Sequence, residues 1–397
     1  PFWGIPEEMY DEVALGAAAN GPVNAVDPDF DIPSQWKAAI GATYNFDAPA
    51  GLGEGYTLSV DFLYTKDRTA ATIVDATLEQ IDTAPDGRPI YRRIDRSDPL
   101  CDTSPATCAS RGFNQDFILT NNDGGSQKVI SAILDKEYDF DNGWRANWAL
   151  AYAYTKAEDR NPMTSSVAFS NYTFSTSDPN NPALATSNYE VPHRFTVRAG
   201  VARAFFGEYE TKANLFGVVS QSRPYSFNFA DGGDLFGDTI DDRHLLYVPT
   251  GSDDPNVIFA GALADPARQA EFFSMLADLG LDKYAGGIVP RNSFQSDWYS
   301  QWDLRIEQEL PGLFRGHKAA AFIVIDNIGN LINDKWGVIN QAGFPGAVDV
   351  VTLDESGLGP NGEYVFDDFN QVTADSIQSP ITSASVWEIR FGVKYEF

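Results

Sequence analysis

The chain shows a two-residue alternation of apolar and polar side chains, and it is clearest at the C-terminal end. Over residues 385–397, most odd positions are aliphatic or aromatic, and most even positions are charged or polar. Successive side chains of a β-strand point to opposite faces of its sheet, so this pattern predicts a strand with one apolar face. A single strand of this kind also fits a soluble sandwich that hides one face.

The alternation recurs in eight other segments, so it describes most of the chain. The nine predicted strands are 35–46, 56–65, 130–138, 144–155, 194–201, 209–219, 302–310, 318–325 and 385–397. Lys136 and Ile133 break the pattern in the third segment. Residues 318–325 are apolar on both faces, which leaves the orientation of that strand open. Tyr and Trp gather near the ends of the apolar faces, as expected where strands cross bilayer interfaces.

Short and long connections alternate between these strands. The short ones, 47–55, 139–143, 206–208 and 310–317, carry turn residues such as Asn142-Gly143. The long ones are 79–125, 156–191, 222–296 and 329–384. Short turns on one side and long loops on the other are typical of outer-membrane barrels. The expected fold is therefore all-β: a large antiparallel transmembrane β-barrel of about nine long strands, with short periplasmic turns and long extracellular loops.

One short helix is expected within the long loops, over residues 265–279. Asp265 can cap it, with Pro266 at its first helical position. Leu263, Phe272, Phe273, Leu276 and Leu279 supply an apolar stripe. Packing within the loops explains this stripe better than a partner surface does.

The expected strand number is odd, whereas bacterial barrels of one chain use an even number. An open edge in lipid would leave backbone groups unsatisfied, at several kcal/mol each. We therefore expect residues 1–397 to be the C-terminal part of a barrel whose first strands precede Pro1 or come from another chain.

Composition narrows the class of protein. Hydrophobic residues make up 43% of the 397 residues, yet no apolar run reaches 18 residues, which excludes a transmembrane helix. Aromatic residues make up 13%, enough to fill interface girdles. The formal net charge of -28 excludes a nucleic-acid partner. This acidity serves either solubility or loops that attract cations.

Few residues offer other chemistry. Cys101 and Cys108 fit a small loop disulfide in an oxidising compartment, with two unpaired thiols as the alternative. Three scattered histidines make no metal site, and His193 is expected to begin a strand rather than bind a ligand. The acidic, Gly-rich stretch 231–242 is either a loop that binds calcium through oxygen ligands or a solvated loop. We expect no catalytic residues, no metal and no cofactor.

Several short motifs together resemble one family. They are IPSQWK (32–37), DNGW (141–144), VPHRF (191–195), SRPYS (222–226), PRNS (290–293), DLRIEQELPG (303–312) and DNIGNLINDKWG (326–337). In this order they resemble the barrel region of TonB-dependent outer-membrane receptors of the Oar-like branch. The last of them is similar to the family's penultimate-strand signature. The terminal Tyr395 and Phe397 look like the signal read by the barrel-assembly machinery.

The resemblance implies a receptor in the outer membrane of a Gram-negative bacterium. Such a receptor takes up a bulky substrate with energy from the TonB complex. The family's N-terminal plug domain and energy-coupling box are not found in this sequence. Outer-membrane lipid and the assembly machinery are the other implied partners. Candidate substrate contacts near the extracellular rim are Arg223, Tyr225, Phe227, Phe229 and Trp298, for which girdle or loop-packing roles are the alternative.

Two other functions stay open. A passive porin would lack a plug and conduct ions. A secreted β-rich enzyme or binding domain would be soluble and would bury its aromatic faces against a second sheet.

Overall fold

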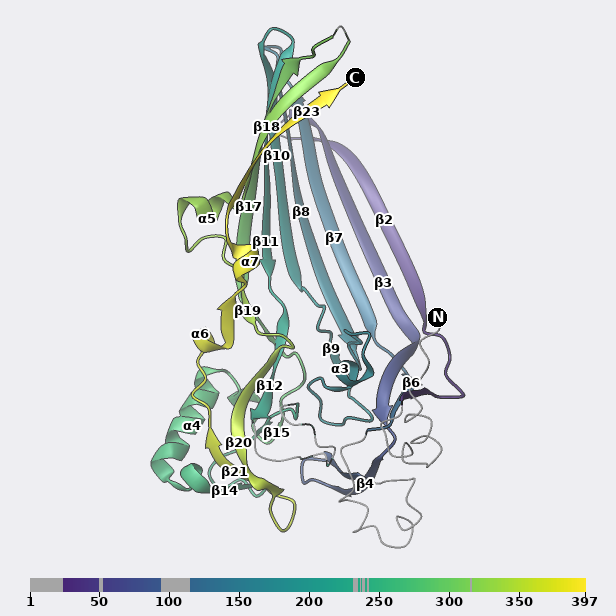
Figure 1. The fold of residues 1–397 in the computed structure, drawn as a ribbon, viewed down its shortest axis with the longest axis vertical. Helices are drawn as coiled ribbons and strands as arrows, with labels where there is room; N and C mark the ends of the chain where they lie inside the picture. The colour runs from purple at the N-terminus through teal and green to yellow at the C-terminus, as the bar shows by residue number, and fades with distance from the viewer. Residues whose placement is uncertain are drawn as a thin grey trace, which may run out of the picture.

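The computed structural model describes residues 24–49, 53–93, 115–230, 235, 237, 240, 243–314 and 316–397, without the side chains of residues 355 and 356. The described chain is mostly β-structure. One large sheet, with the long strands running along the molecule, forms one end, and a compact unit built from the long connections forms the other (Figure 1).

Nine long strands of the large sheet follow one another as an antiparallel meander. They are β2 (Ser34–Ala48), β3 (Gly53–Asp75), β7 (Ser126–Asp139), β8 (Trp144–Asp159), β10 (His193–Phe206), β11 (Tyr209–Gln221), β17 (Trp298–Pro311), β18 (Lys318–Asp326) and β23 (Glu388–Glu396). Each of the nine predicted segments coincides with one of them. The expectation of nine long antiparallel strands is therefore confirmed.

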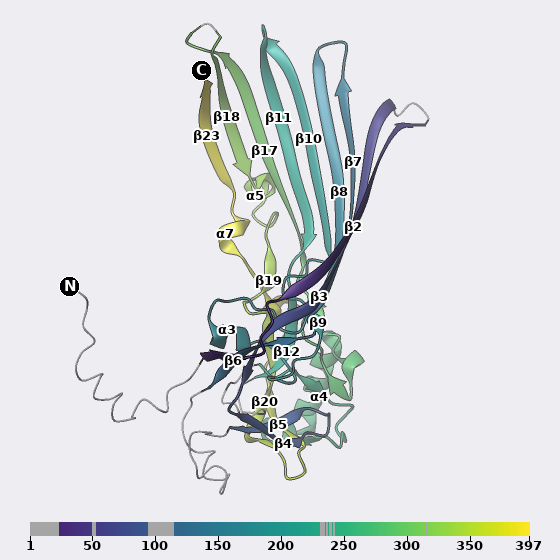
Figure 2. The ribbon, with the colours of Figure 1, turned by 90° about the vertical axis from the view of Figure 1, so that its right-hand side faces the viewer.

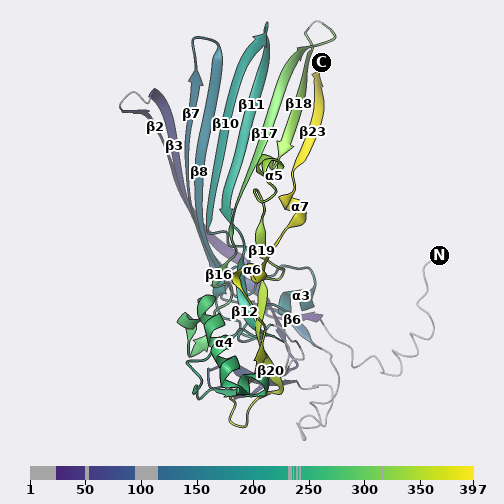
Figure 3. The ribbon, with the colours of Figure 1, turned by 90° about the vertical axis from the view of Figure 1, so that its left-hand side faces the viewer.

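The sheet is open. Among the described residues, β2 pairs only with β3, and β23 pairs only with β18. Figures 2 and 3 show β2 and β23 at opposite edges, with the C-terminus at the end where the short turns lie. The long connections all leave from the other end, which we call the loop end. The predicted separation of short turns from long connections is thus present.

The long connections contain more regular structure than the single expected helix. A five-stranded mixed sheet joins β14 (Val257–Phe259), β21 (Tyr364–Phe369), β20 (Ala347–Leu358), β12 (Pro224–Ala230) and β16 (Phe294–Gln295). We call the described residues of 78–93, 222–296 and 340–380 the loop domain. The expectation of long loops with one helix was wrong, because residues far apart in sequence share a core here that no local pattern displays.

The helix α4 (Pro266–Asp278) lies where the sequence predicts it and packs against this sheet. The Asp265 side chain accepts a hydrogen bond from the Ala267 backbone N–H, and Pro266 begins the helix. Phe272 is fully buried, with its ring 5.4 Å from that of Phe369 and 6.1 Å from that of Phe366. The apolar stripe of α4 therefore packs within the loop domain.

The β4–β5 hairpin, β4 (Leu78–Thr83) and β5 (Pro89–Arg93), closes the loop domain from a distant part of the chain. The buried Arg88 donates to the Leu245 carbonyl at 2.6 Å and lies over the rings of Phe229 and Tyr364. Tyr364 donates to Asp86 at 2.6 Å. Burial raises the pKa of Tyr364 above its usual range, so the phenol keeps the proton that it donates.

The remaining elements are short. The strands are β1 (Asn24–Val26), β6 (Phe117–Asn122), β9 (Ala185–Thr186), β13 (Tyr247–Val248), β15 (Gly287–Ile288), β19 (Asn340–Ala342) and β22 (Gln378–Pro380). The helices are α3 (Ala168–Tyr172), α5 (Ile328–Ile332), α6 (Ala374–Ile377) and α7 (Thr382–Ser385), with 3-10 turns η2 (Gly261–Ala264) and η3 (Asp282–Tyr284). No helix among the described residues is long and apolar enough to cross a membrane.

Removing the Phe272 ring should destabilise the loop domain. We expect Phe272→Ala to cost roughly 3–5 kcal/mol, the usual range for deleting a buried phenyl ring. Hydrogen exchange of the β21 amides should report the loss. Phe273→Ala is the matched control, because Phe273 is only partly buried. Equal effects of the two changes would contradict the assigned core.

The stability of the loop domain should decrease in mild acid. Burial, with Arg243 and Arg88 nearby, holds the pKa of His244 well below its ordinary 6.5. The unfolded chain then binds more protons, so this contribution to stability is complete above pH 6.5 and decreases below it, by up to about 1.4 kcal/mol per pH unit.

Denaturation between pH 5 and 6.5, a window set by the pKa values of His and the carboxylates, measures this slope. His244→Gln should reduce it, whereas His317→Gln, at a turn outside the loop domain, should leave it unchanged. A slope that is the same in all three proteins would refute the role of His244.

Candidate functional site

The register joins the apolar positions of all nine strands into one face. Residues directly opposite each other on neighbouring strands share a face. One row across the sheet is Phe46, Tyr56, Lys136, Trp148, Ala199, Leu215, Leu304, Ile325 and Ile389. The odd positions of β18 share the face of Ile325, which settles the orientation that the sequence leaves open. We call this surface the apolar face and its reverse the polar face.

The apolar face is not covered by a second layer of the described chain. Its large side chains remain exposed along the strands: Trp36 by 72%, Leu150 by 48% and Phe391 by 80%. Figures 2 and 3 show the long strands extending beyond the loop domain without another layer against them.

Aromatic rings form a belt at each end of the apolar face, as the sequence predicts. At the loop end, the His193 ring stacks on that of Trp298 at 5.9 Å, and Phe195 lies 4.7 Å from Tyr152. At the turn end the rings are Tyr44, Phe46, Tyr56, Tyr138, Phe140, Trp144, Trp148 and Phe205. Aliphatic side chains such as Leu134, Leu150 and Val197 lie between the belts.

The exception at Lys136 is explained by its place in the turn-end belt. Its ammonium group lies over the rings of Tyr56 and Tyr138, at 5.5 and 4.7 Å, and donates to the Glu54 carbonyl. Arg203 lies similarly over Trp144 and Phe205, at 5.3 and 5.4 Å. Both cations are thus satisfied by cation–π contacts and, for Lys136, a backbone acceptor. The other exception, Ile133, lies on the polar face opposite Ser59.

The polar face carries a ladder of ion pairs. Arg145 contacts Glu210 at 2.5 Å, Lys212 contacts Glu309 at 2.6 Å, and Arg390 contacts Asp326 at 2.5 Å. The last two pairs join adjacent strands and support their pairing modestly, whereas Arg145 and Glu210 connect β8 and β11 across β10. A surface of this kind is compatible with water and unsuited to hydrocarbon.

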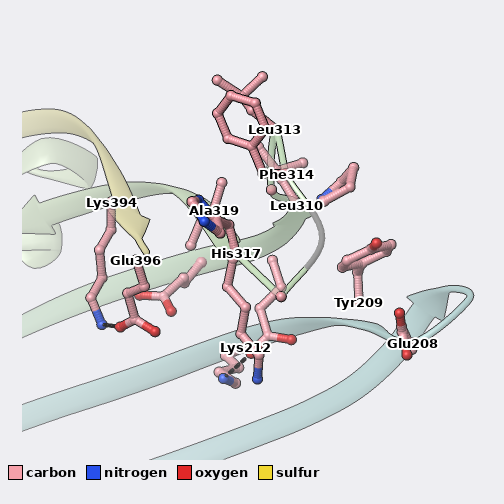
Figure 4. A pocket seen from close by; sticks show the side chains of 17 residues that line it. Glu208, Tyr209, Lys212, Leu310, Leu313, Phe314, His317, Ala319, Lys394 and Glu396 are labelled. Carbon is pink, nitrogen blue, oxygen red and sulfur yellow. Dashed lines mark hydrogen bonds and ion pairs between the residues drawn. The ribbon is translucent and has the colours of Figure 1, made fainter.

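A cavity of about 690 Å³ opens on the polar face at the turn end. Lys212, Glu309, Lys394 and Glu396 line it together with the turn between β17 and β18 (Figure 4). Lys394 pairs with Glu396 in its wall. With both charges present in similar number, the cavity has no evident preference for an anion or a cation.

Close packing on both faces depends on glycine at two positions. A Cβ at Gly217 would lie 2.3 Å from the Trp302 ring, and one at Gly392 would lie 2.2 Å from the Phe322 ring. Each glycine therefore lets an aromatic ring cover the neighbouring strand.

The PRNS motif joins the sheet to the loop domain. The buried Arg291 contacts Asp159 at the end of β8 at 2.6 Å. Asn292 has a positive φ of 55°. Its side-chain oxygen accepts a hydrogen bond from the Ser226 hydroxyl, and its backbone N–H donates to that hydroxyl. Its side-chain amide donates to the Thr186 carbonyl at 2.8 Å. Asparagine tolerates this left-handed backbone better than most residues do. The motif was visible in the sequence, but its role as a junction was not.

In the DNIGNLINDKWG motif, hydrogen bonds of Asn327 join three separate segments of the chain. Asn327 has a positive φ of 51°, and its amide donates to the carbonyls of Gly337 and Ser385 at 2.9 and 3.0 Å. Its backbone N–H donates to Asp303 of β17 at 2.8 Å. The segment after β18 is thereby held against the neighbouring strand.

The proposed substrate contacts do not gather at one rim. Tyr225, Phe227 and Phe229 are buried in the core of the loop domain, with Phe227 only 1% exposed. Of the two roles left open, loop packing accounts for these three aromatic rings, because β12 lies inside the five-stranded sheet. Arg223 is exposed beside β12, and Trp298 belongs to the loop-end aromatic belt. A substrate role for these two remains a prediction.

The structure describes some of the remaining candidate residues, and the others lie outside its described part. His193 begins β10, as expected, and bonds to the Tyr152 hydroxyl at 2.8 Å. Tyr395 lies on the apolar face of the edge strand, with its hydroxyl 2.8 Å from His317 Nδ1, and Phe397 is 98% exposed. Cys101, Cys108 and most of the acidic stretch 231–242 lie outside the described residues. Among those described, no group of three His, Cys, Asp or Glu side chains could hold a metal.

Comparison with protein-family models, with curated proteins and with solved structures found no match for this chain.

Breaking the Arg291–Asp159 pair should loosen the loop domain from the sheet. We expect Arg291→Leu to cost about 3 kcal/mol, the lower end for a buried pair, because Asp159 is partly exposed. The control Arg92→Leu removes the more exposed pair with Glu79 and should cost no more than about 1 kcal/mol. Hydrogen exchange at residues 185–187 and 290–293 measures the difference, and equal protection in both variants would count against the junction.

Proposed function

We propose that this chain forms part of the wall of an outer-membrane β-barrel. The observation that supports it is the uncovered apolar face, bounded by two aromatic belts and backed by a charged face. This arrangement matches a strand wall with lipid on one side and water on the other.

The size of the apolar face favours lipid over water as its neighbour. Strands about 4.8 Å apart, with a stripe roughly 30 Å long, give nine strands a face on the order of 1,000 Å². Soluble monomers rarely expose contiguous apolar patches beyond a few hundred Å². Exposure of such a face to water would favour aggregation.

The height of the stripe also suits a bilayer. On β10 it extends from His193 to Arg203, which is about 33 Å along a strand at roughly 3.3 Å per residue. With a tilt of about 40°, the height is about 25 Å, similar to the apolar band of outer-membrane barrels. The two aromatic belts would then lie at the two bilayer interfaces.

Within this class we propose a TonB-dependent receptor that takes up a bulky substrate. The resemblance of the motifs supports it. Two of them form structural contacts: PRNS joins the sheet to the loop domain, and DNIGNLINDKWG holds the segment after β18 against β17. Tyr395 and Phe397, on the free edge strand, would be read by the barrel-assembly machinery. A soluble sandwich is disfavoured because the described chain places no second sheet over the apolar face.

The two faces should respond oppositely to a new charge. Leu150→Arg should cost roughly 2–4 kcal/mol and reduce assembly, if the side chain lies near the bilayer midplane. Ala149→Arg, one residue away on the polar face, should be tolerated. Ile306→Arg repeats the change on β17, and its comparison is the unchanged protein, in which the neighbouring Arg305 already places a cation on the polar face. Outer-membrane fractionation and heat resistance in detergent measure both comparisons, and equal sensitivity on the two faces would refute the lipid contact.

Receptor and porin differ in conductance. The full-length protein in a planar bilayer should show no steady open channel if a plug fills the barrel, whereas a porin should conduct continuously. The receptor also requires a plug domain, so the complete coding sequence on the 5′ side of the Pro1 codon decides the same question. Steady conductance without a plug domain would establish the porin instead.

A further inference from the structure

Three lysines lie together at the loop end of the apolar face. Lys128 of β7 is directly opposite Lys156 of β8, and Lys66 of β3 is opposite Ser126, two residues from Lys128. Directly opposite side chains are about 5 Å apart at Cβ, and diagonal ones about 7–8 Å. All three side chains are exposed. They therefore form one patch, which we call the lysine cluster.

The charges of the lysine cluster are poorly balanced within the described chain. Lys156 contacts Glu158 at 3.1 Å, whereas Lys66 and Lys128 have no ion-pair partner among the described residues. Like charges directly opposite each other destabilise strand pairing. Glu190 is a second carboxylate close to Lys156, so three ammonium groups face two carboxylates. This leaves an excess of one positive charge in a protein whose formal net charge is -28.

The cations at the turn end provide the contrast. Lys136 and Arg203 also lie on the apolar face, but their charges are covered by aromatic rings of the same chain. At the loop end, Tyr64 lies opposite Lys128 and Trp36 opposite Lys66. The lysine cluster thus lies at the border of the apolar band, where long side chains extend their charged ends toward headgroups.

We propose that the lysine cluster binds the phosphate groups of a phosphorylated lipid in the leaflet at the loop end. This inference rests on the proposed membrane wall. The aliphatic stems and the neighbouring Phe62 and Ile130 would contact acyl chains, while the ammonium groups neutralise the phosphates. Such a lipid would also offset the repulsion between Lys128 and Lys156. The lipid, rather than free phosphate, fits because the cluster continues directly into the apolar face.

The test uses the full-length protein in phosphatidylcholine nanodiscs that contain diphosphoryl lipid A. Native mass spectrometry measures how much of this lipid stays bound. The triple variant Lys66→Gln, Lys128→Gln, Lys156→Gln should bind it roughly tenfold to hundredfold more weakly. The matched control, Lys37→Gln, Lys283→Gln, Lys335→Gln, removes the same charge away from the apolar face and should bind as the unchanged protein does.

The other arms separate the sources of phosphate. Lipid A without its phosphates should bind to the unchanged protein about as weakly as diphosphoryl lipid A binds to the triple variant. Inorganic phosphate should not displace diphosphoryl lipid A from the unchanged protein. Unchanged binding by the triple variant, or equal loss in the control, overturns the site. Displacement by inorganic phosphate indicates a free-anion site and also overturns it. Failure of the unchanged protein to enter nanodiscs contradicts the membrane wall itself, which distinguishes the two failures.

Discussion

The structure depends on one constraint: the two-residue period of apolar side chains stays in phase across nine strands. A shift of one residue in any pairing would turn that strand's apolar side chains to the polar face. The continuous register from β3 to β11 keeps Leu134, Leu150 and Val197 in one row. Because the phase is kept, the exposed apolar positions add up to a single surface instead of scattered patches.

The same phase determines where charge is tolerated. On the polar face, ion pairs such as Lys212–Glu309 extend along the strands without interrupting the apolar face. Among the paired residues of the apolar face, cations lie near the two ends of the strands. At the turn end they are covered by aromatic rings, as at Lys136, and at the loop end they form the lysine cluster. The exception at Lys136 thus follows from its height along the strand as well as from parity.

The sequence predicted the wall of the structure far better than the loop domain. Strand parity is a local property, so each of the nine strands and the helix after Asp265 could be identified from its own residues. The core of the loop domain instead combines Arg88, Phe229 and Tyr364, which no short window contains. For Tyr225, Phe227 and Phe229 the sequence therefore left substrate contact and loop packing both open, since an alternating aromatic segment in a long connection does not reveal what covers it.

The loop domain bears on what the sheet can do. An open sheet alone would leave its strand ends without lateral support, because the long connections would be free to move. Here β8 is tied to the loop domain through Asp159 and Arg291, and β18 is tied to β17 through Asn327 and Asp303. Both ties use buried polar groups, which are costly to leave unpaired, so they hold a defined geometry more strictly than apolar contacts would. The loop-end backbone of β8 is consequently held in a defined position, and β8 is the strand that carries Lys156 of the lysine cluster.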